Sequence, residues 1–273
     1  MIVMEKSIMS DRQVFFDTDA YTPKQMAARV ETSGVAKAEL AIIPLLMLSI
    51  LAGAFIAFGA MFYTMTVTGS TMGLGPTRLL GGAAFSLGLI LVLVGGAELF
   101  TGNSLVVMAW ADRKVSTVAL LRNWGLVYIG NFVGALATAA FVWLSGVLAI
   151  DHGAVAQTAI AIAAGKLQLG WQEAFFRGIL CNVLVCLAVW LCFAARSVAG
   201  KILAILFPIT AFVALGFEHS VANMYLIPIG MASAGVINIV GLLHNLFFVT
   251  LGNMVGGGLL VAAVYYVIYV RRS

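Results

Sequence analysis

Two short polar segments interrupt long apolar stretches of this chain and are the parts most able to do chemistry. GAELFTGN occupies residues 96–103 and GFEHSVAN occupies residues 216–223, about 120 residues later, and both fit Gly-x-Glu-x-x-x-x-Asn. A carboxylate inside a membrane span costs several kcal/mol, so Glu98 and Glu218 would be retained only for a pathway, an ion pair or a backbone ligand. Two such interruptions at corresponding places in two halves of a chain indicate a transport site.

His219 is the sharpest single candidate for a chemical role. It follows Glu218 directly, and an imidazole can donate or accept a hydrogen bond, or carry charge, near neutral pH. The alternative is a structural histidine bonded to a neighbouring carbonyl, but its place in a repeated segment favours a pore role. Glu98 and Glu218 are instead expected to brace their loops by accepting amide hydrogen atoms, because carboxylates lining a pore would repel anions.

Other polar side chains in the apolar stretches are also candidates, because asparagine is costly against lipid and must face protein or pore. For Thr101, Asn182, Asn131 and Asn253, bonding between helices is at least as expected as contact with a substrate. The residues expected to brace the two segments are Glu98, Glu218, Asn103, Asn223, Asn131 and Asn253. Lys166 precedes the fourth apolar stretch, where a lysine either concentrates anions at a pore mouth or is merely solvated.

The composition is that of an all-α integral membrane protein. Of 273 residues, 62% are hydrophobic and 10% are charged, whereas soluble domains are about 45–50% apolar and about 25% charged. The formal charge of +4 does not indicate a nucleic-acid partner, because the basic residues lie at span ends. Cys181, Cys186 and Cys192 share one apolar stretch and are expected to be free thiols. Motifs of common enzymes are absent, and we expect no catalysis, metal or cofactor.

Hydropathy predicts six membrane spans, of which the second and fifth are too long for one straight helix and carry the polar segments near their middles. Such breaks survive at membrane depth only where protein or a water-filled cavity satisfies the backbone. We therefore expect each to be a half-helix, a loop and a second half-helix. The six spans lie near residues 40–66, 79–110, 117–149, 174–195, 201–232 and 237–270.

The two halves repeat beyond the polar segments. Residues 121–134 match residues 243–256, which aligns Asn123 with Asn245 and Asn131 with Asn253, and one Gly-x-x-x-Gly pair with another. Such glycine pairs pack helices closely, either between subunits or inside one protomer. With three spans in each repeat, the halves must insert with opposite orientation.

The predicted organisation is therefore a cytoplasmic segment at 1–39 and a six-span domain at 40–273, with inverted repeats at about 40–150 and 173–270. The bias of lysine and arginine places both termini in the cytoplasm, with Arg78 and Lys166 among the few basic residues outside.

The polar segments, together with Gly252-Asn253 and the glycines of 256–258, resemble the formate–nitrite transporter family. The resemblance extends from about residue 22 to the end, and Glu-His-Ser with its following asparagine is its most specific part. It implies an aquaporin-like six-helix protomer with one pore, in a homopentamer of the plasma (inner) membrane. Glu98 stands where the best-known formate channels carry aspartate, so this segment leaves the substrate open. Segments 22–27, 85–90 and 256–261 favour formate.

The resemblance also implies roles for individual residues. It places the family's central histidine at His219, with partners at Thr101 and Asn182, and its vestibule lysine at Lys166. Its hydrophobic slits would fall on Phe85, Leu89, Leu99, Phe100, Val185 and Phe212.

The sequence therefore predicts a channel or transporter for small weak-acid anions, with formate first and nitrite or hydrosulfide as alternatives. Such an anion would be attracted by Lys166, meet His219 between the slits and cross as the neutral acid. A proton-coupled formate transporter, gated by the N-terminal segment, is the second class. A membrane redox subunit is the third, but the only histidines are His152, His219 and His244, and no two share a span.

Overall fold

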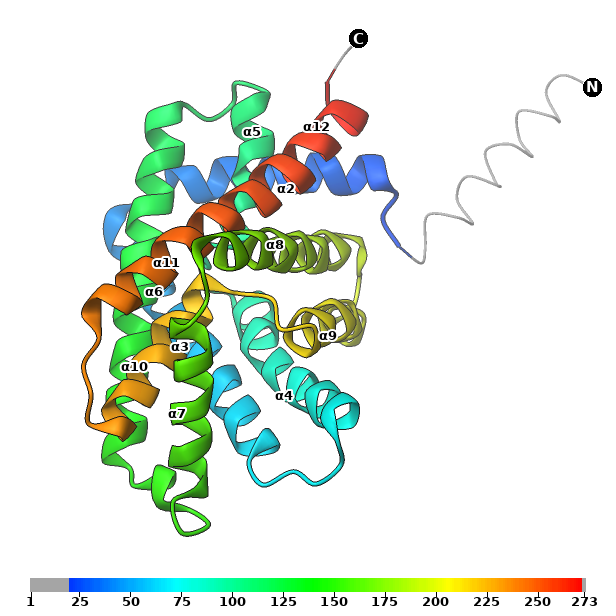
Figure 1. The fold of residues 1–273 in the computed structure, drawn as a ribbon. Helices are drawn as coiled ribbons and strands as arrows, with labels where there is room; N and C mark the ends of the chain where they lie inside the picture. Colours follow the sequence, from blue (N-terminus) through cyan, green and yellow to red (C-terminus); the bar gives the residue numbers. More distant parts are fainter. Residues whose placement is uncertain (1–19, 272–273) are drawn as a thin grey trace, which may run out of the picture.

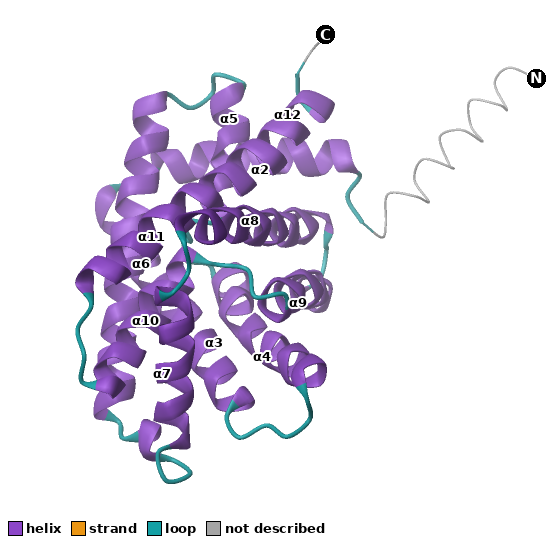
Figure 2. Ribbon diagram, viewed as in Figure 1, coloured by secondary structure: helices purple, strands orange, loops and turns teal. Residues whose placement is uncertain are grey.

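The computed structural model describes residues 20–271, and within that range every regular element is a helix (Figures 1 and 2). A capping box begins the first described helix, because the side chain of Thr22 accepts from the backbone of Gln25 while Gln25 bonds back. The helices are α2 (Pro23–Glu39), α3 (Ile42–Val67), α4 (Leu74–Gly95), η1 (Gly102–Val106), α5 (Val107–Ala111), α6 (Thr117–Leu144), η2 (Val147–Ala149), α7 (Ala154–Leu167), α8 (Trp171–Ala194), α9 (Val198–Ala214), α10 (Ser220–Ala234), α11 (Ile239–Met254), the π-helical η3 (Val255–Ala263) and α12 (Val264–Tyr269).

Five of these helical stretches are long and apolar enough to cross a membrane, so the chain is a multi-pass membrane protein. They are 42–67, 74–95, 117–144, 171–194 and 239–269. The predicted second span corresponds to α4 followed by a loop, η1 and α5. The predicted fifth span is divided into α9 and α10, which hold 17 and 15 residues.

Two helices lie where the sequence analysis predicted none. α7 occupies the predicted outer connection, and α2 lies in the predicted N-terminal segment. Met26 and Val30 of α2 are buried in one cluster with Leu105 and Met108, so α2 is joined to the helical core through packing. The basic residues Lys6, Arg12 and Arg272, which belong to the bias of lysine and arginine toward the cytoplasmic side, lie outside the described range.

The glycine pairs pack helices inside one protomer. A Cβ on Gly134 would meet the carbonyl oxygen of Ile50 in α3, and one on Gly256 would meet the carbonyl oxygen of Ile179 in α8. Gly130 and Gly252 make similar approaches to the same two helices. Of the two roles that the sequence left open for these pairs, the intramolecular one is observed, and α3·α6 and α8·α11 are the close helix pairs that result.

The start of α2 and the end of α12 lie at the same end of the helical bundle, whereas the loops 68–73 and 145–153 lie at the other (Figure 1). The N–H of Tyr21 donates to the carbonyl of Ala194 at the end of α8, at 3.1 Å. This fixes the beginning of α2 beside the connection between α8 and α9. The three cysteines, all in α8, are buried and free.

Candidate functional site

Both polar segments begin in the same way, at a glycine in the left-handed conformation. Gly96 follows α4 with φ 81°, and Gly216 follows α9 with φ 73°. The N–H of the next residue then reaches back to the carbonyl of Val92 at 2.9 Å in the first case and of Phe212 at 3.0 Å in the second. Glycine is favoured at this position because a Cβ is strained at positive φ. The chain then runs as a non-helical loop between helices, which is plainly visible between α9 and α10 in Figure 2.

Asn131 of α6 holds the first interruption through three hydrogen bonds. Its Oδ1 accepts from the N–H of Phe100 at 2.9 Å, and its Nδ2 donates to the carbonyls of Ser49 at 2.8 Å and Glu98 at 2.9 Å. One amide thus satisfies both a donor and an acceptor of unwound backbone that would otherwise be buried without partners.

Asn253 of α11 does the same for the second interruption. Its Oδ1 accepts from the N–H of Ser220 at 2.9 Å, and its Nδ2 donates to the carbonyls of Gly178 at 2.8 Å and Glu218 at 3.0 Å. The alignment of Asn131 with Asn253 in the sequence therefore corresponds to the same set of contacts in space.

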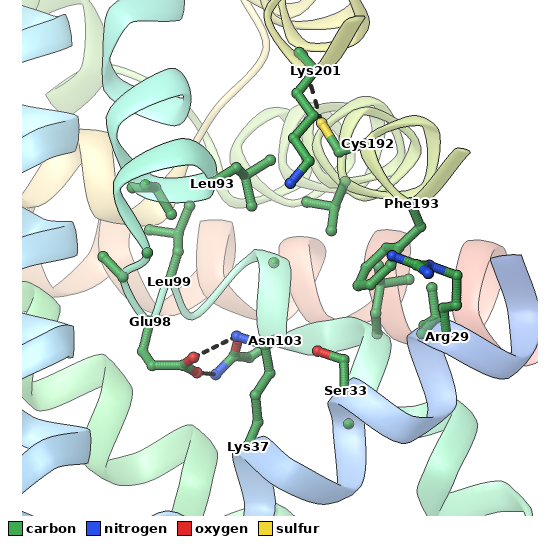
Figure 3. A pocket seen from close by; sticks show the side chains of 18 of the residues that line it. Arg29, Ser33, Lys37, Leu93, Glu98, Leu99, Asn103, Cys192, Phe193 and Lys201 are labelled. Carbon is green, nitrogen blue, oxygen red and sulfur yellow. Dashed lines mark hydrogen bonds and ion pairs between the residues drawn. The ribbon is translucent and has the colours of Figure 1, made fainter. Parts of the chain in front are cut away.

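Glu98 lies at the centre of a charged and amide cluster (Figure 3). Its carboxylate accepts from Lys37 of α2 and from Nδ2 of Asn103, the latter at 2.7 Å. Asn103 also donates to Asn123, whose own Nδ2 donates to the carbonyl of Lys37 at 3.0 Å. The cluster ties α2 and α6 to the first interruption.

Glu218 has an equivalent cluster on the other half. Its two carboxylate oxygens accept from Nζ of Lys166 at 2.9 and 3.0 Å, and one also accepts from Asn223 at 2.6 Å. Asn223 donates to Asn245, which donates to the carbonyl of Lys166 at 2.9 Å. α7 thus supplies the lysine that pairs with the glutamate of the second interruption, as α2 does for the first.

These clusters change two expectations drawn from the sequence. The hydrogen bonds to the two carboxylates come from lysine and asparagine side chains, whereas amide hydrogens of the loops themselves were expected. Lys166 is ion-paired and its side chain is 14% exposed, which differs from a solvated lysine at a pore mouth. Lys37 was missed as a site residue. The available signal was weak: small residues precede both Lys37 and Lys166.

His219 and Thr101 join the two interruptions. The imidazole Nε2 lies 2.9 Å from Oγ1 of Thr101, and both residues are buried. Nδ1 accepts the N–H of Ala222 at 3.1 Å, so the imidazole caps the N-terminus of α10. Because Nδ1 is an acceptor, the proton of the neutral ring is assigned to Nε2, which donates to the threonine hydroxyl.

Apolar side chains surround this pair. Phe212 stacks on the ring of His219 with centroids 5.9 Å apart, and Phe85 meets Phe212 edge-on at 5.5 Å. The remaining residues predicted for the slits, Leu89, Leu99, Phe100 and Val185, are all buried in the same core cluster. The ring of Phe100 packs against Trp124 and Tyr128 of α6.

Asn182 of α8 connects the two halves by donating from Nδ2 to three acceptors. They are the carbonyl of Thr101 at 3.2 Å, the hydroxyl of Ser104 at 3.1 Å and the carbonyl of Asn253 at 2.7 Å. A Cβ on Gly257 would meet Nδ2 of Asn182, so this glycine is what allows η3 to lie so close. The amide hydrogens of Asn182 are thus engaged in holding the breaks together.

A cavity of about 760 Å³ opens on the α2 side of the site. It is lined by α2, the end of α4, the first interruption and the α8–α9 connection, and Leu89 and Leu99 lie among its apolar walls. Figure 3 shows Ser33, Arg29 and Lys201 around it, with the Lys37–Glu98–Asn103 cluster at one edge. We call it the α2-side cavity.

The comparisons with known proteins agree with this arrangement. The sequence profile described as "Formate/nitrite transporter" matches residues 24–267. The formate channel FocA of Escherichia coli (strain K12) is 40% identical over 275 residues, which cover 93% of this chain and 96% of FocA. FocA of Haemophilus influenzae is 41% identical, over 88% of this chain and 92% of its own length.

Two solved structures are similar as well. One, described as a pentameric formate channel with formate bound, has a TM-score of 0.78 and 40% identity, and the match covers 85% of this chain and 98% of that one. A second, described as an FNT family ion channel, has a TM-score of 0.80 and 29% identity, covering 89% and 98%. Paired interruptions, a bridging histidine and these matches lead to one conclusion: this chain belongs to the formate/nitrite transporter family.

Proposed function

We propose that this chain forms a channel or transporter for small monovalent weak-acid anions, with formate as its principal substrate. The similar proteins are described as formate channels, and one solved relative holds formate. The observation that carries the proposal is the hydrogen-bonded pair of His219 and Thr101, buried among apolar side chains. A bare anion is expensive to move through apolar surroundings, so a donor pair in the middle of such a path lowers the highest part of the barrier.

The hydrogen bonds of the pair indicate how it would act. Nε2 of His219 donates to Thr101, and among residues 20–271 the hydroxyl of Thr101 has no other recorded side-chain or backbone partner. Its hydrogen is therefore available to an oxygen of the anion. A second proton on the ring would go to Nδ1, where it would face the N–H of Ala222 and open the cap of α10. His219 thus serves as a neutral hydrogen-bond donor, and the proton that converts the anion into its acid is taken up from bulk solution and released to bulk solution on the other side.

The proposed architecture is a six-span protomer in which the second and fifth spans are broken and the halves form an inverted repeat. It is supported by the equivalent glycine ends at Gly96 and Gly216 and by the equivalent clamps of Asn131 and Asn253. In this arrangement α4 with η1 and α5 forms the second span, and α9 with α10 forms the fifth.

We further propose a homopentamer in the plasma (inner) membrane, with both termini in the cytoplasm and the α2-side cavity facing inward. The solved relative described as pentameric supports the assembly. The position of α2 and α12 at one end of the bundle supports the orientation, and so do Lys114 and Arg196 in two connections, because Lys114 pairs with Glu31 of α2 and Arg196 lies over Tyr21 at the start of α2.

Proteoliposomes that contain the purified protein provide the test. Uptake of labelled formate and of nitrite would be measured in parallel, with His219→Phe as the matched inactive variant and protein-free vesicles as background. Formate uptake above both controls supports the proposal, whereas nitrite uptake without formate uptake contradicts it. A pH-sensitive dye inside the vesicles separates a simple anion channel from proton-coupled passage, because only the latter acidifies the lumen under an inward anion gradient.

A further inference from the structure

We propose that Arg78 is a positioning residue, which sets the spacing of the Phe85 and Phe212 rings and so limits the size of the anion that passes between them. It does so by joining the start of α4, which carries Phe85, to the end of α9, which carries Phe212. These two helices lie side by side (Figure 1). The proposal rests on the proposed function, because a limit on size has meaning only in a chain that carries anions.

The end of α9 lacks a backbone donor, and Arg78 supplies one. In a continuing helix the carbonyl of Ala214 would accept the N–H of Glu218, but that N–H donates to the carbonyl of Arg177 at 3.2 Å. Nη1 of Arg78 donates to the carbonyl of Ala214 instead, at 3.1 Å. A cation at the C-terminus of a helix is also favoured by the helix dipole, so the contact stabilises the end of α9.

The same guanidinium covers the bend that follows α9. A Cβ on Gly216 would lie 3.5 Å from Nη1 of Arg78. The N–H of Phe217 donates to the carbonyl of Phe212 at 3.0 Å, and the ring of Phe212 stacks on that of His219. The bend that Arg78 covers is therefore the backbone from which both rings extend.

The bond of Arg78 is the last of three contacts that follow one another at intervals of one helical turn along α4 and α9. The hydroxyl of Ser86 lies 3.4 Å from the carbonyl oxygen of Leu206, and a Cβ on Gly82 would meet the carbonyl oxygen of Thr210. Each step of four residues back along α4 corresponds to four residues forward along α9. The two helices are thus antiparallel, and Arg78 fixes their register at the end nearest the bend.

Phe85 and Phe212 lie beside this line of contacts. Their rings meet edge-on with centroids 5.5 Å apart, and both residues are buried. Phe85 follows Arg78 by seven residues, which is about two helical turns and brings both to the same face of α4. Phe212 precedes Ala214 by two residues. A shift at the bond between Arg78 and Ala214 would therefore reach the two rings through short lengths of rigid helix.

Positioning differs from attraction in one measurable quantity. A charge that attracts anions acts alike on all monovalent anions, whereas the spacing of two rings acts according to their size. The ratio of uptake of a larger carboxylate to that of a smaller one separates the two roles. Arg177 provides the matched control, because it is a second cation beside the same interruption, but its side chain pairs with Glu173.

Uptake of labelled acetate and formate into proteoliposomes, measured in parallel at one pH, gives this ratio. We expect acetate uptake relative to formate uptake to rise several-fold in Arg78→Met and to keep the parent value in Arg177→Met. Arg78→Lys retains a donor for the carbonyl of Ala214 and should return the ratio toward that of the parent. If Arg78→Met slows both anions equally, or leaves both unchanged, the proposal is overturned.

A thiol in the contact between α4 and α9 tests the positioning without transport. Thr210 is buried, and among residues 20–271 its hydroxyl has no hydrogen-bond partner, so Thr210→Cys changes few contacts. Its reaction with methyl methanethiosulfonate, a small neutral reagent, should become several-fold faster when Arg78→Met is added and stay constant when Arg177→Met is added. The protein without Thr210→Cys gives the background from its own cysteines. Equal rates in all three would overturn the proposal.

The two measurements together separate the proposal from the proposed function. If the parent carries neither formate nor acetate, the proposed function fails, while the labelling rates still decide whether Arg78 holds α4 against α9. If the labelling rates differ but an active protein keeps the same uptake ratio, the contact does not limit the size of the anion, and the proposal is overturned.

Discussion

The Nε2 atom of His219 lies 2.9 Å from the hydroxyl of Thr101, although the two residues are 118 positions apart in the chain. This contact joins the two non-helical loops at the centre of the bundle and makes one hydrogen-bonding unit of them. Each loop is stabilised by the hydrogen bonds of an asparagine and by a lysine–glutamate ion pair. The donors that an anion would meet are thus supported by two equivalent sets of contacts.

Removal of the ring should slow transport. In His219→Phe the buried hydroxyl of Thr101 loses its hydrogen-bond partner, and a buried polar group left unsatisfied costs about 1–3 kcal/mol, so formate uptake should fall by about tenfold or more. His219→Asn retains hydrogen-bonding groups and is expected to pass anions with an altered pH dependence. Uptake between pH 5 and 8 in proteoliposomes checks both. An unchanged rate and pH profile in His219→Phe, with normal assembly, would make the ring purely structural.

Loss of Lys166 should damage stability more than attraction. Lys166→Ala leaves the buried carboxylate of Glu218 without its cation, and breaking such a pair costs about 3–5 kcal/mol. The melting temperature in detergent should therefore drop, and high salt should not restore uptake. Lys166→Met with Glu218→Gln removes both charges and should recover most of the stability. If Lys166→Ala melts like the parent and only its low-salt uptake is slower, the lysine is an attractor after all.

Loss of Asn131 and loss of Asn253 should lower the thermal stability of the protein by similar amounts. Asn131→Leu and Asn253→Leu each remove three hydrogen bonds from buried backbone, at about 1 kcal/mol for each bond and more where a group is left unsatisfied. Asn131→Asp retains the acceptor for Phe100 but places a buried carboxylate oxygen against the carbonyls of Ser49 and Glu98, so it should be destabilised at least as much. Thermal unfolding of the purified variants measures the ranking. A stable Asn131→Leu beside an unstable Asn253→Leu would contradict their equivalence.

Acidification should increase the stability that Glu31 contributes at the contact between α2 and the loop that follows α5. Burial raises the pKa of Glu31 above its ordinary value near 4.5, while its bond with Lys114 lowers it and Asp112 raises it. The folded protein therefore binds this proton more readily than the unfolded chain does, so the free energy of unfolding gains from this group as pH falls through the raised pKa, and the gain is complete below about 4.5.

The difference in melting temperature between the parent and Glu31→Gln isolates this effect. Between pH 7 and pH 4 the parent should gain relative to Glu31→Gln, whose amide does not titrate. Glu39→Gln, on an exposed position of the same helix, is the control. If the melting temperature of the parent falls relative to that of Glu31→Gln on acidification, the ion pair of Glu31 with Lys114 outweighs the effect of burial on the pKa of Glu31.

The sequence by itself determined the membrane class, the two interruptions and most of their supporting residues. Hydropathy and a carboxylate in an apolar stretch are local properties, so Glu98 and Glu218 could be located without a structure. The pairing of Asn131 with Asn253 followed from equal spacing in two halves. The expectation that the three cysteines are free thiols is confirmed, because it followed from their position in one apolar stretch.

Only the tertiary structure decided which charges cancel. Lys37 and Glu98 are 61 residues apart, and Lys166 and Glu218 are 52 apart, on helices α2 and α7 that hydropathy did not reveal. A lysine attracts anions or braces a loop according to whether a carboxylate lies within a few ångströms, and no local pattern encodes that distance. The same reason left Arg29 unnoticed as a site residue until folding placed it beside a cavity.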